Sequence, residues 1–265
     1  MPDWDPSRLS AGTLTAWYKA DSLSLGDGSG VASWTDSSGN GHDVAQSASA
    51  RQPTFETNEL NSKPVLRFDG SNDILTNGDI AALDVGTGDI WLAAVFKSTD
   101  NSAAQNYFEK GAAQYGLRTT SAGELQMILG STSNIPSQSN GNWSRTAFVI
   151  VTASRVSSTC NGFVNGTAST TTGTTNTGSI SNSDVFDIGS RAVGAGPMVG
   201  DMAEVLVGGA TLDTNERQKI EGYLAHKYDL EANLPSDHPY KSAAPGYRVQ
   251  FGISSGLIDG GLIQA

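Results

Sequence analysis

Two segments, "IWLAAVFKS" at residues 90–98 and "RTAFVIVTAS" at residues 145–154, decide the fold of this 265-residue chain. Both are apolar at consecutive positions and not only at alternate ones. Successive side chains of a strand point to opposite faces, so such a segment is expected where both faces of a sheet are covered. We therefore expect these two segments to be central strands of a sandwich and to form its core.

Shorter and more polar segments occur before, between and after these two, with Gly, Ser and Asn breaks at intervals of roughly 8 to 12 residues, a spacing typical of sandwiches. Asn165-Gly166 is a strong hairpin signal, and the polar run at 167–179 is expected to be a loop. The expected strand segments are "TLTAWYKA", "KPVLRFDG", "NDIL", "QNYFEKG", "QYGLRTT", "ELQMIL", "DVFDIGSR" and "GDMAEVLVGG". "KPVLRFDG" and "NDIL" are expected to be consecutive antiparallel strands. The pattern predicts an all-β, two-sheet antiparallel sandwich.

Helical patterning appears once, at residues 213–228. Asp213 is a suitable N-cap, with Glu216 three residues later. The apolar stripe of this amphipathic helix consists of Ile220, Tyr223, Leu224 and Tyr228. The helix should lie against the sandwich.

The glycine-rich segment after the helix is expected to lie outside the domain. We assign residues 1–242 to one domain and residues 243–265 to an extended tail. The apolar tail residues are expected to dock either on a neighbouring subunit or partner or on the domain itself. They are Leu257, Ile258, Leu262 and Ile263.

Composition limits the partners. Sixteen basic and 27 acidic residues give a formal charge of -11, without a basic cluster, so nucleic acid is not an expected partner. The first residues lack the pattern of an export signal, and no apolar run approaches the ~18 residues of a membrane span. We expect a soluble protein made without a cleaved signal and not inserted in a membrane. Cys160, the single cysteine, is expected to be an ordinary strand-edge thiol.

The stretch "WTDSSGNGHD" at residues 34–43 is a candidate calcium loop. Asp36, Asn40 and Asp43 offer oxygen ligands of the kind that calcium prefers, although the spacing is not that of an EF-hand. Asp and Asn also stabilise turns by bonding their own backbone, which makes a purely structural loop the favoured alternative. No cofactor is expected to be required.

Three aromatic residues are candidates for sugar contact. Tyr107, Tyr115 and Trp143 could stack on sugar faces while nearby polar groups bind hydroxyls. Each could equally belong to the core, because Tyr107 lies within an expected strand and Trp143 begins one.

Several motifs, in this order, resemble the laminin-G-like, concanavalin-A-like jelly-roll domains of bacteriophage virion and bacterial surface proteins. The resemblance covers residues 10–242 and rests on "LTAWYKAD", "VASWTDSSGNGHD", "KPVLRFDGSNDIL", "FVNG", "FDIGSR", "GDMAEVLV" and "ERQKIEGYLAHKYDL" with the later "LPSDHPYK". It implies a two-sheet jelly roll with binding loops at one rim, occasional calcium near that rim, and recognition of glycans or partners without turnover.

Catalytic patterns are missing. Retaining glycosidases on this kind of sandwich resemble one another in an E-x-D-x-x-E strand, which this chain lacks. Asp201 and Glu204 are three residues apart and are expected to point to opposite faces of a regular strand. We interpret Glu204 as a partnered structural carboxylate.

These observations predict a non-enzymatic structural protein of a phage particle, on a tail, fibre or capsid surface, located in the virion after assembly in the host cytoplasm. Expected partners are other virion proteins, a second copy of the chain and host surface glycan. The alternative is a bacterial carbohydrate-binding or adhesion module. A polysaccharide hydrolase is a remote third reading.

Overall fold

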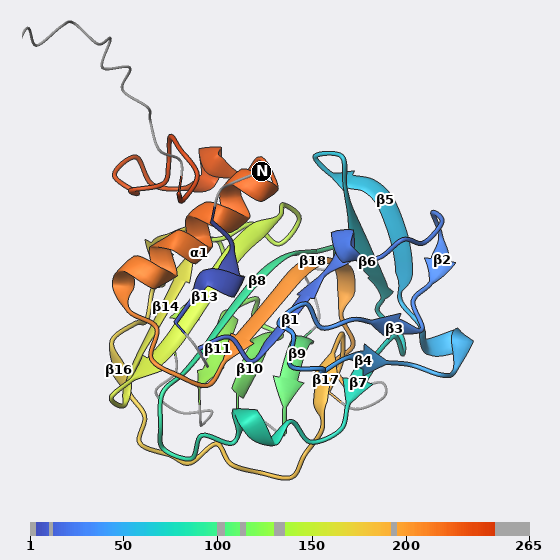
Figure 1. Cartoon of the computed structure of the whole chain (residues 1–265), viewed down its shortest axis with the longest axis horizontal. Coiled ribbons are helices and arrows are strands. Elements are labelled where there is room, and N and C mark those ends of the chain that lie inside the picture. The colour runs from blue at the N-terminus through green and yellow to red at the C-terminus, as the bar shows by residue number, and fades with distance from the viewer. Residues whose placement is uncertain are drawn as a thin grey trace, which may run out of the picture.

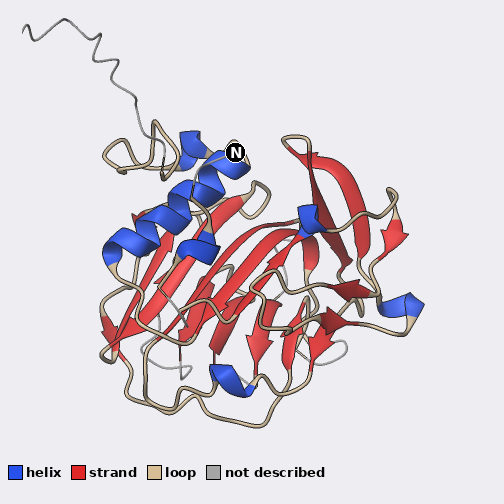
Figure 2. Cartoon of the chain, in the orientation of Figure 1, coloured by secondary structure: helices blue, strands red, loops and turns tan. Residues whose placement is uncertain are grey.

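The computed structural model describes residues 4–10, 13–99, 104–111, 115–129, 136–191 and 195–246. Two antiparallel sheets and one long helix make up most of this part of the chain (Figure 2). The all-β two-sheet sandwich with a late helix is therefore confirmed. Leu257, Ile258, Leu262 and Ile263, for which docking was predicted, lie outside the described residues. None of the described helices is both long and apolar enough to cross a membrane.

Sheet A has ten strands, eight of them in one continuous order and two that pair with strands inside this order. The continuous order is β15 (Thr167–Ala168), β14 (Thr159–Val164), β13 (Val149–Val156), β8 (Ile90–Ser98), β18 (Val199–Gly208), β6 (Lys63–Asp69), β5 (Thr54–Leu60) and β2 (Ser29–Gly30). The additional strands are β1 (Ala16–Lys19), which pairs with the second half of β18, and β16 (Thr174–Thr175), which pairs with β14.

Sheet B has eight strands and lies behind sheet A in Figure 1. Its order is β12 (Ser137–Gln138), β11 (Leu125–Leu129), β10 (Tyr115–Thr119), β9 (Gln105–Lys110), β17 (Phe186–Ile188), β7 (Leu75–Asn77), β4 (Val44–Ala45) and β3 (Ser33–Trp34). Short 3₁₀ turns connect the strands: η1 (Pro6–Arg8), η2 (Ala20–Ser22), η3 (Ser49–Arg51), η4 (Ala81–Leu83) and η5 (Glu231–Asn233).

The two doubly apolar segments are neighbours in the middle of sheet A. β8 pairs with β13 from Ile90 to Phe96, and its side chains alternate between two separate apolar clusters. Leu92, for example, packs between the sheets, whereas Trp91 belongs to the cluster under the helix. The prediction of central strands covered on both faces is confirmed, and the second cover is helix α1 (Thr214–Lys227) (Figure 1).

Helix α1 begins and ends where the sequence predicted. The side chain of the N-cap Asp213 accepts a hydrogen bond from the N–H of Glu216, and Tyr228 is the C-cap. Every residue of the predicted stripe is buried. The helix therefore adds a third layer, and the outer face of sheet A is a second core instead of a solvated surface.

Glu221, which is fully buried on α1, links the helix to the sheet. Its carboxylate accepts hydrogen bonds from Thr152 Oγ1 on β13 at 2.6 Å and from Arg217 Nη1 at 2.6 and 2.7 Å. His238 Nε2, in the segment after the helix, lies 3.1 Å from the same carboxylate. A buried carboxylate is tolerated only when its oxygens are bonded in this way, so these contacts fix where α1 sits.

Two expectations about the strands are wrong. β6 and β7 belong to different sheets, because the polar turn between them carries the chain across the sandwich. In that turn Asp73 accepts a hydrogen bond from the N–H of Asp69, and Asp69 accepts one from the N–H of Ser71. The run at 167–179 contains β15 and β16, because Asn165 and Gly166 both adopt positive φ and fold it back onto β14.

A β-bulge in β18 places Asp201 and Glu204 on one face of the sheet, so the expectation that they point to opposite faces is wrong. The register of β18 shifts between Met202 and Glu204, so Asp201 lies opposite Lys97 and Glu204 lies opposite Val95. Lys97 and Val95 are two residues apart on one strand and share a face. The two carboxylates therefore share the outer face of sheet A, although a regular strand would have separated them.

Glu221→Ala should lower the free energy of unfolding by about 3–5 kcal/mol, because Arg217 would lose its buried partner. Urea unfolding followed by tryptophan fluorescence measures this loss. Lys219→Ala on the same helix is the matched control, because the Lys219 side chain makes no hydrogen bond or ion pair with a described residue, and should change stability by less than about 0.5 kcal/mol. Equal losses in the two variants would contradict the anchoring role of Glu221.

Candidate functional site

A hollow with a volume of about 620 Å³ lies where the C-terminal end of α1 meets β1 and the β5–β6 hairpin. This volume lies within the range of about 300–1,000 Å³ that is usual for small-ligand sites. We call it the helix groove. Its lining combines aromatic, amide and charged side chains: Asp5, Trp17, Lys19, Asp21, Asn61, Ser62, Lys63, Tyr223, His226, Lys227 and Asp229.

The base of the helix groove is formed by two aromatic residues. Trp17 and Tyr223 meet edge to face, with ring centroids 6.2 Å apart. Trp17 Nε1 donates a 2.6 Å hydrogen bond to Glu204, and Lys19 Nζ lies 4.1 Å from the centre of the Trp17 ring. Trp17 is only 3% exposed, so the base contributes ring edges and no open stacking platform.

Glu204 also fixes one wall of the helix groove. Its carboxylate accepts hydrogen bonds from Lys227 Nζ at 2.6 Å and from Tyr228 OH at 2.8 Å. Lys227 Nζ also donates a 2.8 Å hydrogen bond to Asp21. Burial lowers the pKa of Lys227, but the charges of Glu204 and Asp21 and the bonds to them outweigh it and raise that pKa above its ordinary value. Burial first, then the same two carboxylates, raise the pKa of Tyr223. The interpretation of Glu204 as a partnered carboxylate is confirmed.

The opposite wall is the tip of the β5–β6 hairpin, where Asn61 and Ser62 adopt positive φ values of 48° and 66°. Asn61 Nδ2 donates a 2.5 Å hydrogen bond to the carbonyl oxygen of Tyr228. This bond satisfies one of the carbonyls left open at the helix end and holds the hairpin against the helix. Asp229, with φ of 52°, then turns the chain away from the helix.

Lys19 is held over the Trp17 ring, and three further side chains of the helix groove are uncommitted. Lys63, Ser62 and Asp229 make no side-chain hydrogen bond or ion pair with any other described residue, whereas the neighbouring charges of Lys227 and Asp21 are paired. The groove therefore offers an ammonium and a hydroxyl as donors and a carboxylate as an acceptor on a prearranged frame.

The three predicted glycan contacts do not lie in the helix groove. Tyr107 and Tyr115 are fully buried between the sheets, and Trp143 is 9% exposed and donates to the carbonyl oxygen of Gly123. Tyr107 packs on Phe96 with ring centroids 4.2 Å apart. Rings packed in this way have no face for a sugar, so we assign all three to the core.

The predicted calcium loop is braced by its own hydrogen bonds. Asp36 accepts bonds from the backbone N–H groups of Trp17, Ser38 and His42, and from Ser38 Oγ. Asp43 Oδ1 accepts from the N–H of Asp36. Asn40 directs its amide nitrogen at the carbonyl oxygens of residues 14 and 15. These donors already use the oxygens of Asp36, so the loop fits a structural brace better than a cation site.

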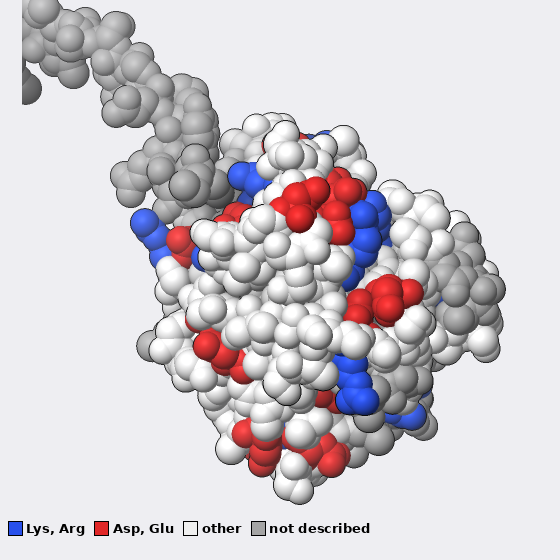
Figure 3. Space-filling view, turned by 90° about the vertical axis from the view of Figure 1, so that its right-hand side faces the viewer, with Lys and Arg blue, Asp and Glu red and all other residues white. Residues whose placement is uncertain are grey.

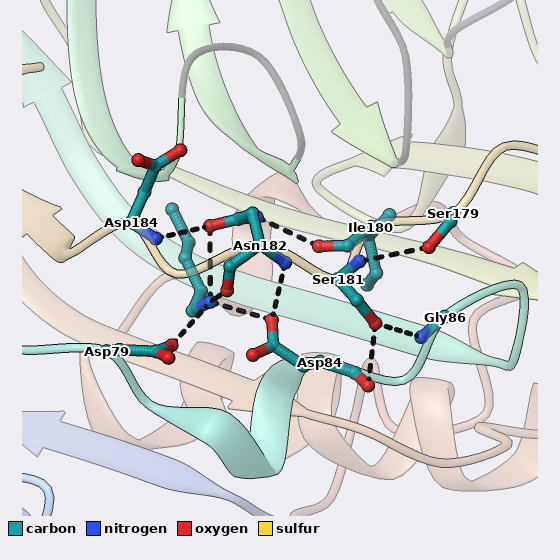
Figure 4. Close-up of polar contacts among 9 residues, drawn as sticks. Asp79, Asp84, Gly86, Ser179, Ile180, Ser181, Asn182 and Asp184 are labelled. Atoms are coloured by element: carbon teal, nitrogen blue, oxygen red, sulfur yellow. Dashed lines mark hydrogen bonds and ion pairs between the residues drawn. The ribbon is translucent and has the colours of Figure 1, made fainter.

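An oxygen cage lies elsewhere, and a lysine occupies it. Asp79, Asp84 and Asn182 are directed at a common point, the position of Lys110 Nζ (Figure 4). The ammonium lies 2.7 Å from Asp84 Oδ1, 2.9 Å from Asp79 Oδ1 and 2.9 Å from the carbonyl oxygen of Asn182. Lys110 is fully buried at the end of β9. It therefore supplies a positive charge to a set of oxygens of the kind that metal ions bind.

Charges of both signs are interspersed on the face of the molecule shown in Figure 3. On the face beside β2, β5 and β6, Lys and Arg side chains lie next to Asp and Glu side chains and form no continuous basic area among the described residues (Figure 3). Arg67, for example, contacts Glu56, Glu59 and Asp201. This face offers no basic surface of the kind that nucleic acid requires.

Cys160 has no features of a nucleophile. It is buried on β14, and burial raises its pKa to about 11. A thiol with such a pKa is protonated near neutral pH, in agreement with an ordinary structural cysteine.

Comparison with known proteins identifies similar folds but no family. No family model matches the chain, and no curated protein matches its sequence. Among solved structures, sialidase from Trypanosoma rangeli in complex with sialic acid has a TM-score of 0.54 and 16% identity, and the match covers 82% of this chain and 33% of that one. The chain thus spans about a third of the sialidase's length.

A second similar structure is matched over almost its whole length. Domain 4 of AbnA, a GH43 extracellular arabinanase from Geobacillus stearothermophilus, was solved in complex with arabinotriose. The TM-score is 0.54 with 14% identity, and the match covers 77% of this chain and 96% of that domain. These likenesses agree with the two-sheet sandwich but give no support to the bacteriophage part of the resemblance.

Lys110→Ala should lower the free energy of unfolding by about 2–4 kcal/mol, below the upper range for buried pairs because Asp79 is 37% exposed. Thermal unfolding measures the loss. Lys219→Ala on α1 is the control and should have little effect. Calcium chloride should raise the unfolding temperature of Lys110→Ala more than that of the unmodified chain, because the oxygens would then lack a cation. An unchanged stability of Lys110→Ala would contradict this assignment.

Proposed function

We propose that this protein binds carbohydrate without turnover and that the helix groove holds a neutral oligosaccharide. The observation that carries the proposal is the set of free polar groups in the groove, Lys63, Ser62 and Asp229, above the edges of Trp17 and Tyr223. Hydroxyl groups of a sugar both donate and accept hydrogen bonds, so a site with donors and acceptors side by side suits them.

The mixed charges of the groove favour a neutral ligand. Lys227 and Asp21 neutralise one another, and the free ammonium of Lys63 is accompanied by the free carboxylate of Asp229. Three Asp and three Lys side chains line the groove, so it has no excess positive charge to attract a strongly anionic ligand. Hydrogen bonds between sugar hydroxyls and charged groups are stronger than those between neutral groups, which compensates for the small aromatic surface.

The comparisons support a binding module, since the sandwich is similar to nearly the whole of a domain solved with arabinotriose. Among the functions considered for this sequence, a carbohydrate-binding or adhesion module agrees better with these likenesses than a virion structural protein. Location in a virion, contacts with other virion proteins and self-association stay predictions, with the motif resemblance as their only support.

Binding without catalysis is our preferred reading of the acidic residues. Asp201 is bonded to Arg67 and Lys97, and Glu204 is bonded to the helix. A second candidate pair arises from the register of sheet B, which places Glu109 opposite Asp187. Their exposed fractions are 2% and 5%. Carboxylates this deeply buried are poorly placed for attack on a polymer, so we propose a structural role for them.

Isothermal titration calorimetry with arabinotriose and a panel of neutral oligosaccharides tests the proposal. Lys63→Met and Asp229→Asn should each weaken binding about ten-fold, the magnitude expected for a lost hydrogen bond to a charged group. Asparagine tolerates the positive φ at 229, so the fold should persist. Lys219→Met and Asp237→Asn are the matched controls.

Failure of every neutral sugar to bind, or equal affinities in groove and control variants, would refute the groove as the binding site. A reducing-end assay on the sugars that bind checks the absence of turnover. Product release that is lost in Glu109→Gln would replace the binding module with a hydrolase.

A further inference from the structure

A second hollow, at one end of sheet B, has a different electrostatic character from the helix groove. Its volume is about 430 Å³, and its charged lining residues are two arginines, without any Asp or Glu. We call it the arginine hollow. It is lined by Ala104, Asn106, Arg118, Thr119, Thr120, Ser121, Arg191, Ala195 and Gly196. In a chain with a formal charge of -11, a hollow whose charged lining is only positive favours an anionic ligand over a cationic one.

Arg118 is held by one nitrogen of its guanidinium group. It lies on the outer face of β10, opposite Asn106 on β9 and Gln126 on β11. Arg118 Nε donates a 2.9 Å hydrogen bond to Gln126 Oε1, and Gln126 is fixed in turn by Glu124 at 2.9 Å. Both Nη groups make no hydrogen bond to any described residue. The side chain is thus oriented while the end of its fork stays open.

Arg191 lies in a segment that is attached to sheet B. The backbone N–H of Arg191 donates to the carbonyl oxygen of Ala195, and Asn106 Nδ2 donates to the same oxygen at 3.0 Å. The backbone N–H of Asn106 donates to the carbonyl oxygen of Gly196 at 2.7 Å. Gly196 has φ of 62°, a backbone conformation that other residues rarely adopt, and a Cβ there would lie 2.5 Å from Asn106 Nδ2.

Neither arginine of the arginine hollow forms an ion pair with a carboxylate of the described residues. Arg67 and Arg217 have acidic partners at 2.7 and 2.6 Å. Arg155 instead donates to a set of backbone carbonyls. Two guanidinium groups left without such partners in one concave site indicate that the missing anion is a ligand.

We propose that the arginine hollow binds the carboxylate of an acidic saccharide. A guanidinium group presents N–H donors in a planar fork that matches a carboxylate, and two of them can hold its two oxygens. The hydroxyl of Ser121 and the side chains of Thr120 and Asn106 line the same hollow and are suited to sugar hydroxyls. The arginine hollow and the helix groove share no lining residue, so a test of the acidic ligand in the hollow is independent of the neutral ligand proposed for the groove.

Calorimetric titration with two matched pairs of probes tests this inference at low salt. The first pair is tri-galacturonate and its methyl ester, and the second is 3′-sialyllactose and lactose. At least one acidic probe should bind ten-fold or more tightly than its neutral partner, and acetate, a free carboxylate, should bind far more weakly. Arg118→Gln and Arg191→Gln should each reduce that affinity about ten-fold, and Arg51→Gln, an exposed arginine elsewhere, should not.

Circular dichroism melting of each variant separates lost binding from lost folding. Arg191→Gln is the safer variant because the exposed Arg191 side chain makes no hydrogen bond or ion pair with other described residues. The inference would be overturned if neither acidic probe binds, or if each acidic probe binds no more tightly than its neutral counterpart. It would also be overturned if both arginine variants keep the affinity of the unmodified chain. Acetate binding as tightly as the trisaccharides would overturn the saccharide as the source. Loss of acidic binding in Lys63→Met, with the arginine variants unaffected, would place that ligand in the helix groove instead.

Discussion

The structure depends on two buried carboxylates that point in opposite directions across one interface. Glu204 rises from sheet A and binds Lys227 and Tyr228 of the helix region, while Glu221 descends from α1 and binds Thr152 of the sheet. Burial of each carboxylate is unfavourable unless the facing element, the helix for Glu204 and the sheet for Glu221, supplies its hydrogen-bond donors. Apolar packing alone would let a helix slide over a sheet, whereas this reciprocal bonding fixes one position, and the base and wall of the helix groove are built from it.

Much of the fold could be predicted from sequence because its signals are local. The doubly apolar 90–98 segment predicted a central strand, Asp213 predicted a helix start, and Asn165-Gly166 predicted a hairpin. The errors came from long-range geometry. An extra residue at Ala203 brings Asp201 and Glu204 to one face, and no sequence pattern announces a bulge. Likewise, the assignment of β6 and β7 to different sheets depends on where a turn directs the chain.

The candidate sites were harder to predict than the fold. Tyr107, Tyr115 and Trp143 were plausible sugar contacts by residue type, but aromatic residues in strands of a sandwich mostly fill the core, as these do. The helix groove joins residues near 17, 62 and 228, and the arginine hollow joins residues near 118 and 191. Such combinations exist only after folding. One signal in the sequence could have pointed to the arginine hollow. Arg118 is a charged residue within a half-polar strand, and its side chain has to lie on the outer face of the sheet.

Lys110 gives the rim of sheet B a property that a metal ion could not give it. A bound ion comes and goes with its concentration, and the segments that it orders loosen when it leaves. The ammonium that joins Asp79, Asp84 and Asn182 is tethered to the backbone by its own side chain, so its local concentration never changes. The connection before β8 and the one before β17 should therefore stay together in fluids rich in chelators, where a rim held by a dissociable ion would open.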